Sequence, residues 1–225
     1  MNDHKWRLTL LEHITFEEAQ DWYREADPVH DFDHVLRVYR MAERLARAEG
    51  ADLTIVRAAA WLHDACGSAP GNDGGERAAH HLTSAEFAGQ VLHEKGWPPD
   101  QIQAVQHCIR AHRFRSQGEA PHTLEAKVLF DADKLDVLGA IGAARTIAYA
   151  ALDGKPAYAE PSAQFIQTGQ KEPGEPHSSY HEFLFKLRNV KDRLFTESGQ
   201  ALAEARHAYM VAFYQQLQAE VRGER

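Results

Sequence analysis

The chain of 225 residues is 44% hydrophobic and 26% charged, which is ordinary for a globular protein with a sizeable core. Its formal net charge of −8 argues against a general nucleic-acid-binding surface, whereas a metal ion can still bring local positive charge to a phosphorylated small molecule. No segment approaches the run of about 20 apolar residues that spans a bilayer, and the N-terminus lacks a signal-peptide pattern, so we expect a cytoplasmic protein.

Helical periodicity dominates the first half of the chain. Apolar side chains recur at helical spacing from Phe32 to Glu49, and Gly50 ends this predicted helix. Three more helices are predicted at about residues 54–66, 84–93 and 100–111. Thr54 and Ser84 are the expected N-caps of the first two, because a hydroxyl accepts from the free N–H groups of a helix start. The glycine-rich stretch between them is expected to be a loop.

The second half of the chain is predicted to be helical as well. One long helix is expected from Leu124 to Ala151, although Gly139 and Gly142 are poor helix formers. Residues 153–179 hold four prolines and little periodic apolar content, so we expect a long irregular excursion there.

Two final helices are expected, at about residues 180–195 and 197–221. No alternating strand pattern of useful length occurs in the sequence, which favours an all-α fold. We therefore predict a single helical-bundle domain over residues 1–225, in which the C-terminal helices, at about 180–221, follow the excursion.

Polar side chains interrupt two of the predicted apolar stripes. His34 lies on the apolar stripe of its helix, and His63 lies on that of the next one. Asp64 is about 100° round from His63 on a helix, so adjacent side chains can reach one metal ion. A buried carboxylate is costly unless it is paired, hydrogen-bonded or metal-bound. Asp31 and Asp33 are expected to be an N-cap and a first-turn acid.

A third acidic cluster occurs in "LFDADKLDVLGAIGAAR", which begins at Leu129. On a helical projection Asp133 and Asp136 point away from a stripe of lysine and arginine, whereas Asp131 lies nearer the exposed edge. Asp133 is therefore the better candidate for a buried ligand, and Asp136 for a supporting group.

His34, His63, Asp64 and Asp133 together make a mixed nitrogen and oxygen ligand set, within a metal-binding core at about residues 30–150. Such a set suits one divalent ion: Mn²⁺, Fe²⁺, Co²⁺, Ni²⁺ or Zn²⁺, with Mg²⁺ also tolerated. The lack of thiolate ligands argues against a structural zinc site. An ion with open positions polarises a phosphoryl oxygen and lowers the pKa of a bound water.

The ordered set of His34, His63 with Asp64, and Asp133 resembles the H…HD…D pattern of the HD-domain metal-dependent phosphohydrolase superfamily. The "ADKL" around Asp133 matches the context of the family's last aspartate. From about residue 30 to 220 the chain resembles the bacterial nucleotide pyrophosphohydrolases of that superfamily. This resemblance implies hydrolysis of (deoxy)nucleoside triphosphates to monophosphate and pyrophosphate with an ion of the Mn²⁺ type.

Three residues are candidates for catalysis. His112, in "IRAHRF", matches a position in the family, which implies a phosphate contact or a proton donor. Asp64 can also take the proton of the attacking water. Glu76 is acidic and close in sequence to the predicted metal ligands, so it is a candidate for orienting that water. His80 and His81, beside the glycine-rich loop, are expected to be exposed.

Four cationic side chains are candidates for holding phosphate groups. Lys134, Arg145 and Lys186 match positions in the family pattern, and simple surface exposure is the alternative for the first two. Arg113 lies in the basic run "RAHRFR", which is either a phosphate clamp or a solvated helix end.

Two other functions compete with a pyrophosphohydrolase. One is a phosphomonoesterase acting on nucleoside monophosphates, and the long excursion favours a triphosphate over it. The other is a non-catalytic nucleotide sensor, against which the complete ligand set counts. The expected partner is a phosphorylated small molecule, a nucleotide in the favoured interpretation, with a homodimer as a candidate assembly and no stable binding to nucleic acid or membrane.

Overall fold

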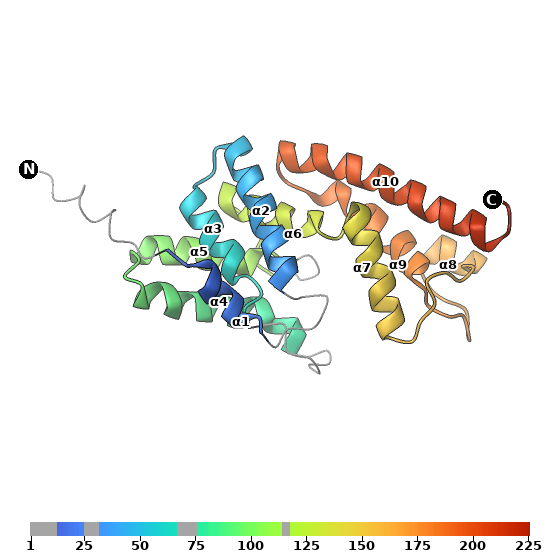
Figure 1. Ribbon diagram of the computed structural model, residues 1–225, viewed down its shortest axis with the longest axis horizontal. Coiled ribbons are helices and arrows are strands. Elements are labelled where there is room, and N and C mark those ends of the chain that lie inside the picture. Colours follow the sequence, from blue (N-terminus) through green and yellow to red (C-terminus); the bar gives the residue numbers. More distant parts are fainter. Residues whose placement is uncertain (1–12, 25–31, 67–75, 114–117) are drawn as a thin grey trace, which may run out of the picture. The chain divides into compact units, whose positions relative to one another are not determined.

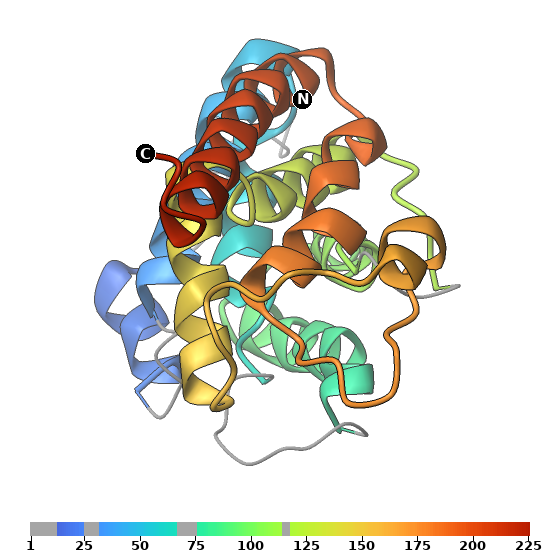
Figure 2. The ribbon, with the colours of Figure 1, turned by 90° about the vertical axis from the view of Figure 1, so that its right-hand side faces the viewer.

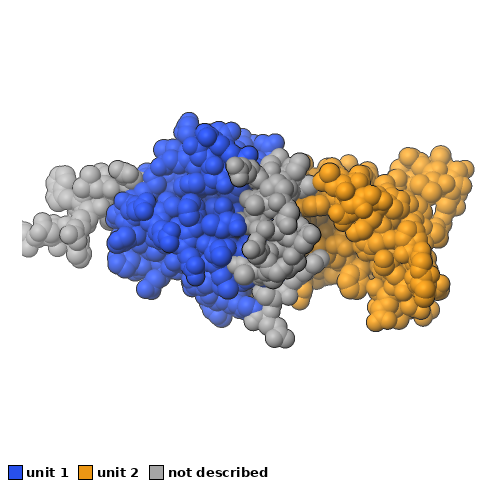
Figure 3. Space-filling model, turned by 90° about the horizontal axis from the view of Figure 1, so that it is seen from below, with its two compact units in different colours: residues 1–133 blue, residues 134–225 orange. Residues whose placement is uncertain are grey.

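A computed structural model describes residues 13–24, 32–66, 76–113 and 118–225, with only the backbone of residues 76–79. The chain divides into two compact units, residues 1–133 and 134–225, and each is described by itself (Figure 3). In the described residues every regular element is a helix and none is a strand, which confirms the predicted all-α fold. The single domain over residues 1–225 stays a prediction. No single helix in these ranges has both the length and the apolar composition needed to cross a membrane.

The first unit is built on helices α1 to α6 (Figure 1). Their bounds are α1 (Phe16–Trp22), α2 (Phe32–Glu49), α3 (Leu53–Leu62), α4 (Glu76–Glu94), α5 (Pro99–Ala111) and α6 (Leu124–Leu135), of which α6 belongs to this unit as far as Asp133. α3 packs against α2, α4 and α5, and α4 also packs against α5. Because α3 is buried along most of its length, its end lies inside the unit, where functional side chains can meet.

The predicted bounds of α2 are confirmed, and those of the next helix are wrong at both ends. α3 begins at Leu53, where the Asp52 carboxylate accepts from the N–H of Thr54 at 2.7 Å, so Asp52 and not Thr54 is the N-cap. α3 ends at Leu62, and His63 with Asp64 therefore follow the helix. The predicted N-cap role of Asp31 lies outside the described residues.

The helix predicted to start at Ser84 begins eight residues earlier, at Glu76. Ser84 is buried inside α4, and its hydroxyl accepts from the N–H of Cys66 at 3.2 Å. Ser84 thus fixes the chain that follows Asp64, in place of the N-cap role that the sequence suggests.

The prediction of one long helix from Leu124 to Ala151 is wrong. The chain forms two helices there, since α6 ends at Leu135 and the next helix begins after a short turn. The second, α7 (Gly139–Leu152), begins at a glycine whose φ of +74° lies in the left-handed region that favours glycine. The prediction that Asp131 lies at an exposed edge is wrong, since its side chain is fully buried. α6 is buried on nearly every side, so a helical projection that assumes one exposed face places Asp131 wrongly.

The second unit holds α7 to α10, and α10 packs against α7 (Figure 2). The elements after α7 are α8 (Ala163–Thr168), α9 (Ser179–Phe185), the 3₁₀ turns η2 (Leu187–Asn189) and η3 (Lys191–Arg193), and α10 (Glu197–Val221). The bounds of α10 are as predicted, whereas the helix predicted at 180–195 is α9 followed by two 3₁₀ turns. The excursion expected over residues 153–179 is irregular apart from α8 as far as residue 178, and Ser179 begins α9.

The irregular excursion is held together by one carboxylate, that of Glu175. It accepts from the backbone N–H and hydroxyl of Ser162 at 2.8 and 2.7 Å, and from the N–H of Glu172 at 2.7 Å. The Nε2 of His181 lies 3.0 Å from it. These hydrogen bonds, the Ser162 backbone bond first, lower the pKa of Glu175 to about 2.

Candidate metal centre

The end of α3 orients the ring of His63. His63 is the C-cap residue, and its Nδ1 lies 2.8 Å from the carbonyl oxygen of Ala60, one of the last carbonyls of the helix. A carbonyl oxygen only accepts, so the proton of the neutral ring is on Nδ1 and the lone pair is on Nε2. This Nε2 is buried and has no hydrogen-bond partner among the described residues.

The end of α5 repeats this arrangement with His112. His112 is the C-cap residue of α5, and its Nδ1 lies 2.5 Å from the carbonyl oxygen of Ile109. Its Nε2 lies 3.4 Å from the Oδ1 of Asp64. Two helix ends thus present imidazole Nε2 atoms, both from almost completely buried side chains, to the same small volume.

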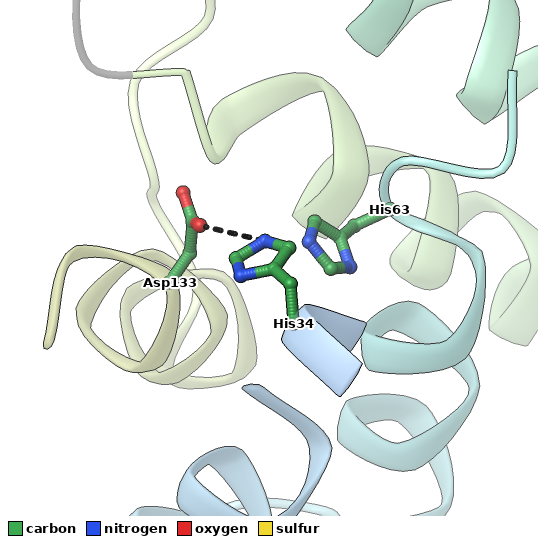
Figure 4. Close-up of side chains that lie close together, drawn as sticks. All are labelled: His34, His63 and Asp133. Carbon is green, nitrogen blue, oxygen red and sulfur yellow. Dashed lines mark ion pairs between the residues drawn. The ribbon is translucent and has the colours of Figure 1, made fainter. Parts of the chain in front are cut away.

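His34 joins this volume from the first turn of α2, and Asp133 joins it from α6 (Figure 4). The Nε2 of His34 lies 3.6 Å from the Oδ1 of Asp133 and 3.8 Å from the Oδ2 of Asp64. The His34 and His63 rings are 5.5 Å apart between centroids. The structure therefore brings together all four residues that the sequence proposes as metal ligands.

Six side chains form two adjoining groups, and the ligand atoms of each group lie within 4.8 Å of one another. The groups are His34 with His63 and Asp133, and Asp64 with His80 and His112. Asp64 connects them, because its Oδ2 faces His63 at 3.7 Å while its Oδ1 faces His80 at 3.4 Å.

These donors fit a divalent cation. A neutral ring of His112, with its proton held on Nδ1, presents only a lone pair to the Asp64 carboxylate. A lone pair and a carboxylate repel each other unless a proton or a metal ion lies between them. Imidazole nitrogen and carboxylate oxygen suit Mn²⁺ and its neighbours in the first transition row. The Asp64, Asp133 and His80 side chains remain 14%, 13% and 21% exposed, so the centre is open on the side of these three residues.

The electrostatic surroundings keep Asp64 ionised. Burial by itself raises the pKa of this carboxyl group, but protonated imidazoles at His63, His112 and His80, by positive charge and by hydrogen bonds to the carboxylate, outweigh it. The pKa of Asp64 consequently lies well below its ordinary value, and the residue is a carboxylate at neutral pH.

The expectation that His80 and His81 are exposed is wrong. His80 is largely buried and faces Asp64, and the His81 side chain is only 7% exposed. His80, Ser84 and Ala88 lie one turn apart on one face of α4, and the last two are buried, so this helix carries His80 toward the core. Burial, helped by the charges of Arg113, His112 and His80, lowers the pKa of His81 to about 4.

The remaining predicted residues of the first unit lie around this centre or outside the description. Glu76 is the first residue of α4, and its side chain is outside the described residues. Arg113 follows the end of α5 and is half-buried. The roles proposed for both stay predictions.

Lys134, Arg145 and Lys186 belong to the second unit. Asp136 is buried after the end of α6 and pairs with the guanidinium of Arg145, and its role as a support for the metal ligands stays a prediction. The ammonium of Lys186 donates to the Glu182 carboxylate at 2.7 Å. Phosphate binding by these three cations stays a prediction.

Comparison with known proteins identifies the family. The model of the HD domain matches residues 31–138, a range that holds all six side chains of the two groups. YpgQ of Bacillus subtilis is 32% identical over 197 residues, which are 86% of this chain and 85% of YpgQ. The chain belongs to the HD-domain family. HD domains bind divalent metals, and this HD-domain protein is, in general class, a metal-dependent phosphohydrolase.

Solved structures similar to this HD-domain protein cover nearly its whole length. A Lactobacillus plantarum protein is 29% identical, with a TM-score of 0.69, over 99% of this chain and 100% of its own. YpgQ in complex with ADP is 26% identical, with a TM-score of 0.67, over 91% and 93%. An HD-superfamily hydrolase from Bacillus thuringiensis is 31% identical, with a TM-score of 0.63, over 86% and 87%. The similarity therefore extends beyond the residues that the family model matches.

Proposed function

We propose that this protein hydrolyses (deoxy)nucleoside triphosphates to the monophosphate and pyrophosphate, with one divalent ion, Mn²⁺ first, held by His34, His63, Asp64 and Asp133. The main evidence for a metal centre is the Nε2 atom of His63. This atom is buried, has no hydrogen-bond partner among the described residues, and lies 3.7 Å from the Oδ2 of Asp64. A buried nitrogen in that state is destabilising by about 1–3 kcal/mol, and coordination removes this penalty.

One observation supports a nucleotide as the substrate, and the charge of the chain sets a condition on its binding. YpgQ, which is similar over most of both chains, has been crystallised with ADP. The net charge of −8 means that a triphosphate needs concentrated local positive charge, which a divalent ion and a few arginines and lysines supply. Among the predicted phosphate contacts, Arg113 is the one that follows the helix carrying His112 at its end.

A divalent ion in this centre supplies Lewis acidity toward a phosphoryl oxygen and toward the attacking water. The protein's own contribution is to place and move a proton. Asp64 stays ionised, and its Oδ1 lies 3.4 Å from the Nε2 atoms of His80 and His112. Because the Nδ1 of His112 is committed to Ile109, this ring can exchange a proton only at Nε2. We assign Asp64 and His112 together as the pair that receives the proton of the water.

In the proposed reaction the water oxygen forms a bond to the α-phosphorus, and the bond from the α-phosphorus to the bridging oxygen breaks. The electron pair of that bond leaves with pyrophosphate. Arg113 is proposed to neutralise the charge of the leaving group.

The test uses protein stripped of metal and reloaded with Mn²⁺, incubated with deoxynucleoside triphosphates in ¹⁸O-labelled water. We expect pyrophosphate and a monophosphate that carries one ¹⁸O atom. His63→Ala should abolish turnover, whereas His93→Ala, which changes an exposed histidine at the end of α4, should not.

Three results contradict the proposal in different ways. Orthophosphate released only from monophosphates would indicate a phosphomonoesterase. Tight nucleotide binding without turnover would indicate a sensor. Label recovered in pyrophosphate would place the attack at the β-phosphorus.

A further inference from the structure

A tyrosine outside the proposed ligand set contacts the turn that carries two of the ligands. Tyr23 is the C-cap residue of α1 and is only 4% exposed. Its hydroxyl donates to the carbonyl oxygen of Trp61 at 2.8 Å. Trp61 lies in the last turn of α3, two residues before His63.

The Trp61 carbonyl needs this partner because α3 ends there. The last carbonyls of a helix have no N–H group four residues ahead to receive. The N–H of Ala65, which would bond to Trp61 in a continued helix, bonds to the carbonyl of Leu62 at 3.3 Å. The Tyr23 hydroxyl thus donates the hydrogen bond that the Ala65 N–H would donate in a continued helix. It does so at the turn that leads into His63 and Asp64.

The surroundings of Tyr23 keep its hydroxyl protonated. Burial, with the charge of the Asp64 carboxylate, raises the pKa of Tyr23 well above its ordinary value. The hydroxyl therefore keeps its proton and is available as the donor to the Trp61 carbonyl.

The position of Tyr23 is set by contacts that do not involve its hydroxyl. α1 is joined to its neighbours through Phe16 on Phe32 with ring centroids 4.9 Å apart, Trp22 on Phe87 at 5.5 Å, and Glu18 to Lys95 at 2.7 Å. Phe32 is the residue at which α2 begins, two residues before His34. α1 is therefore seated on α2 and α4 as well as on the end of α3.

We propose that Tyr23 is a positioning residue for the metal centre, whose hydroxyl holds the turn at His63 and Asp64 so that both side chains face the ion. This inference rests on the proposed function. A tyrosine that only satisfied a buried carbonyl would contribute to folding stability and leave metal affinity unchanged. A positioning tyrosine acts on two adjacent ligands through one backbone segment, so its loss lowers metal affinity.

The test compares Tyr23→Phe with Tyr39→Phe. The first keeps the ring and removes the hydroxyl. Tyr39 is a matched control, because its ring stacks on Trp61 at 4.1 Å while its hydroxyl is influenced by Arg57 and Glu43. Calorimetric titration of metal-free protein gives the Mn²⁺ dissociation constant, and thermal unfolding of the same samples gives stability.

We expect the dissociation constant of Tyr23→Phe to rise about tenfold, the low end of the range for groups that orient metal ligands, and that of Tyr39→Phe to stay within twofold. Replacing Tyr23 by 4-aminophenylalanine keeps a donor and should recover affinity to within threefold of wild type. This third variant also decides the matter if Tyr23→Phe does not fold, because a tenfold loss in it overturns the proposal.

The outcomes separate this inference from the proposed function. Wild-type protein that binds Mn²⁺, with Tyr23→Phe binding it equally well but unfolding at a lower temperature, refutes the positioning role alone. Wild-type protein that binds no Mn²⁺ refutes the metal centre and the positioning role together.

Discussion

Replacing Asp64 by asparagine keeps the shape of the side chain and removes its charge. The Oδ1 atom lies 3.4 Å from the Nε2 atoms of His80 and His112, and Oδ2 lies 3.7 Å from that of His63. In the variant, a cation held among these nitrogens and the carboxylate loses the attraction of one full negative charge. Removing one partner of a buried pair typically costs about 3–5 kcal/mol. Since 1.36 kcal/mol is tenfold, the Mn²⁺ dissociation constant should rise by about two to nearly four powers of ten.

The assay is calorimetric titration of metal-free Asp64→Asn with Mn²⁺, checked by the metal content of the purified protein. Asp33→Asn is the matched control, because Asp33 is an exposed carboxylate in the first turn of α2, next to His34. We expect the control to bind as the wild type does. Binding by Asp64→Asn within threefold of wild type would show that Asp64 does not hold the ion.

Three further predictions concern stability. His81 has a pKa of about 4 in the folded protein and about 6.5 in the unfolded chain, so between pH 4 and pH 6.5 unfolding takes up a proton. The free energy of unfolding therefore falls as the pH falls from 6.5 to 4, by at most about 1.4 kcal/mol per pH unit. In urea titrations His81→Leu should flatten this dependence, and an unchanged slope would contradict the burial of a neutral imidazole. Glu175→Ala should speed limited proteolysis within residues 153–179, and an unchanged cleavage rate would mean that its hydrogen bonds do not hold the excursion. Gly142→Ala places a Cβ atom 2.2 Å from the carbonyl oxygen of Val137, so we expect a loss of about 2 kcal/mol in urea unfolding, and a variant as stable as wild type would contradict this close approach.

The sequence predicts best where one apolar stripe runs between clear helix signals. α2 is such a case, since its apolar stripe is regular and Gly50 follows it. The same stripe identifies His34 as a polar residue that faces the core. Prediction was weaker where two caps compete. Asp52 and Thr54 are both good N-caps. The carboxylate of Asp52 accepts a hydrogen bond from the N–H of Thr54, so the helix begins at Leu53, one residue before the predicted start.

His80 and Asp131 show why the rest was not predictable in the same way. The first two turns of α4 follow a glycine-rich stretch and hold few apolar residues, so the helix start and the face of His80 were missed together. Asp131 lies on a helix that is buried on nearly every side, and a projection that assumes one exposed face misplaces any polar residue on such a helix. Both errors come from tertiary packing, which periodicity along one segment does not contain.

The most direct test of the central claim is anomalous X-ray diffraction from crystals of the Mn²⁺-loaded protein, measured at the manganese absorption edge. The proposed centre predicts one strong peak coordinated by His34, His63, Asp64 and Asp133. A peak at any other set of residues, or a second peak of equal height between Asp64, His80 and His112, would contradict a single-ion centre held by these four side chains.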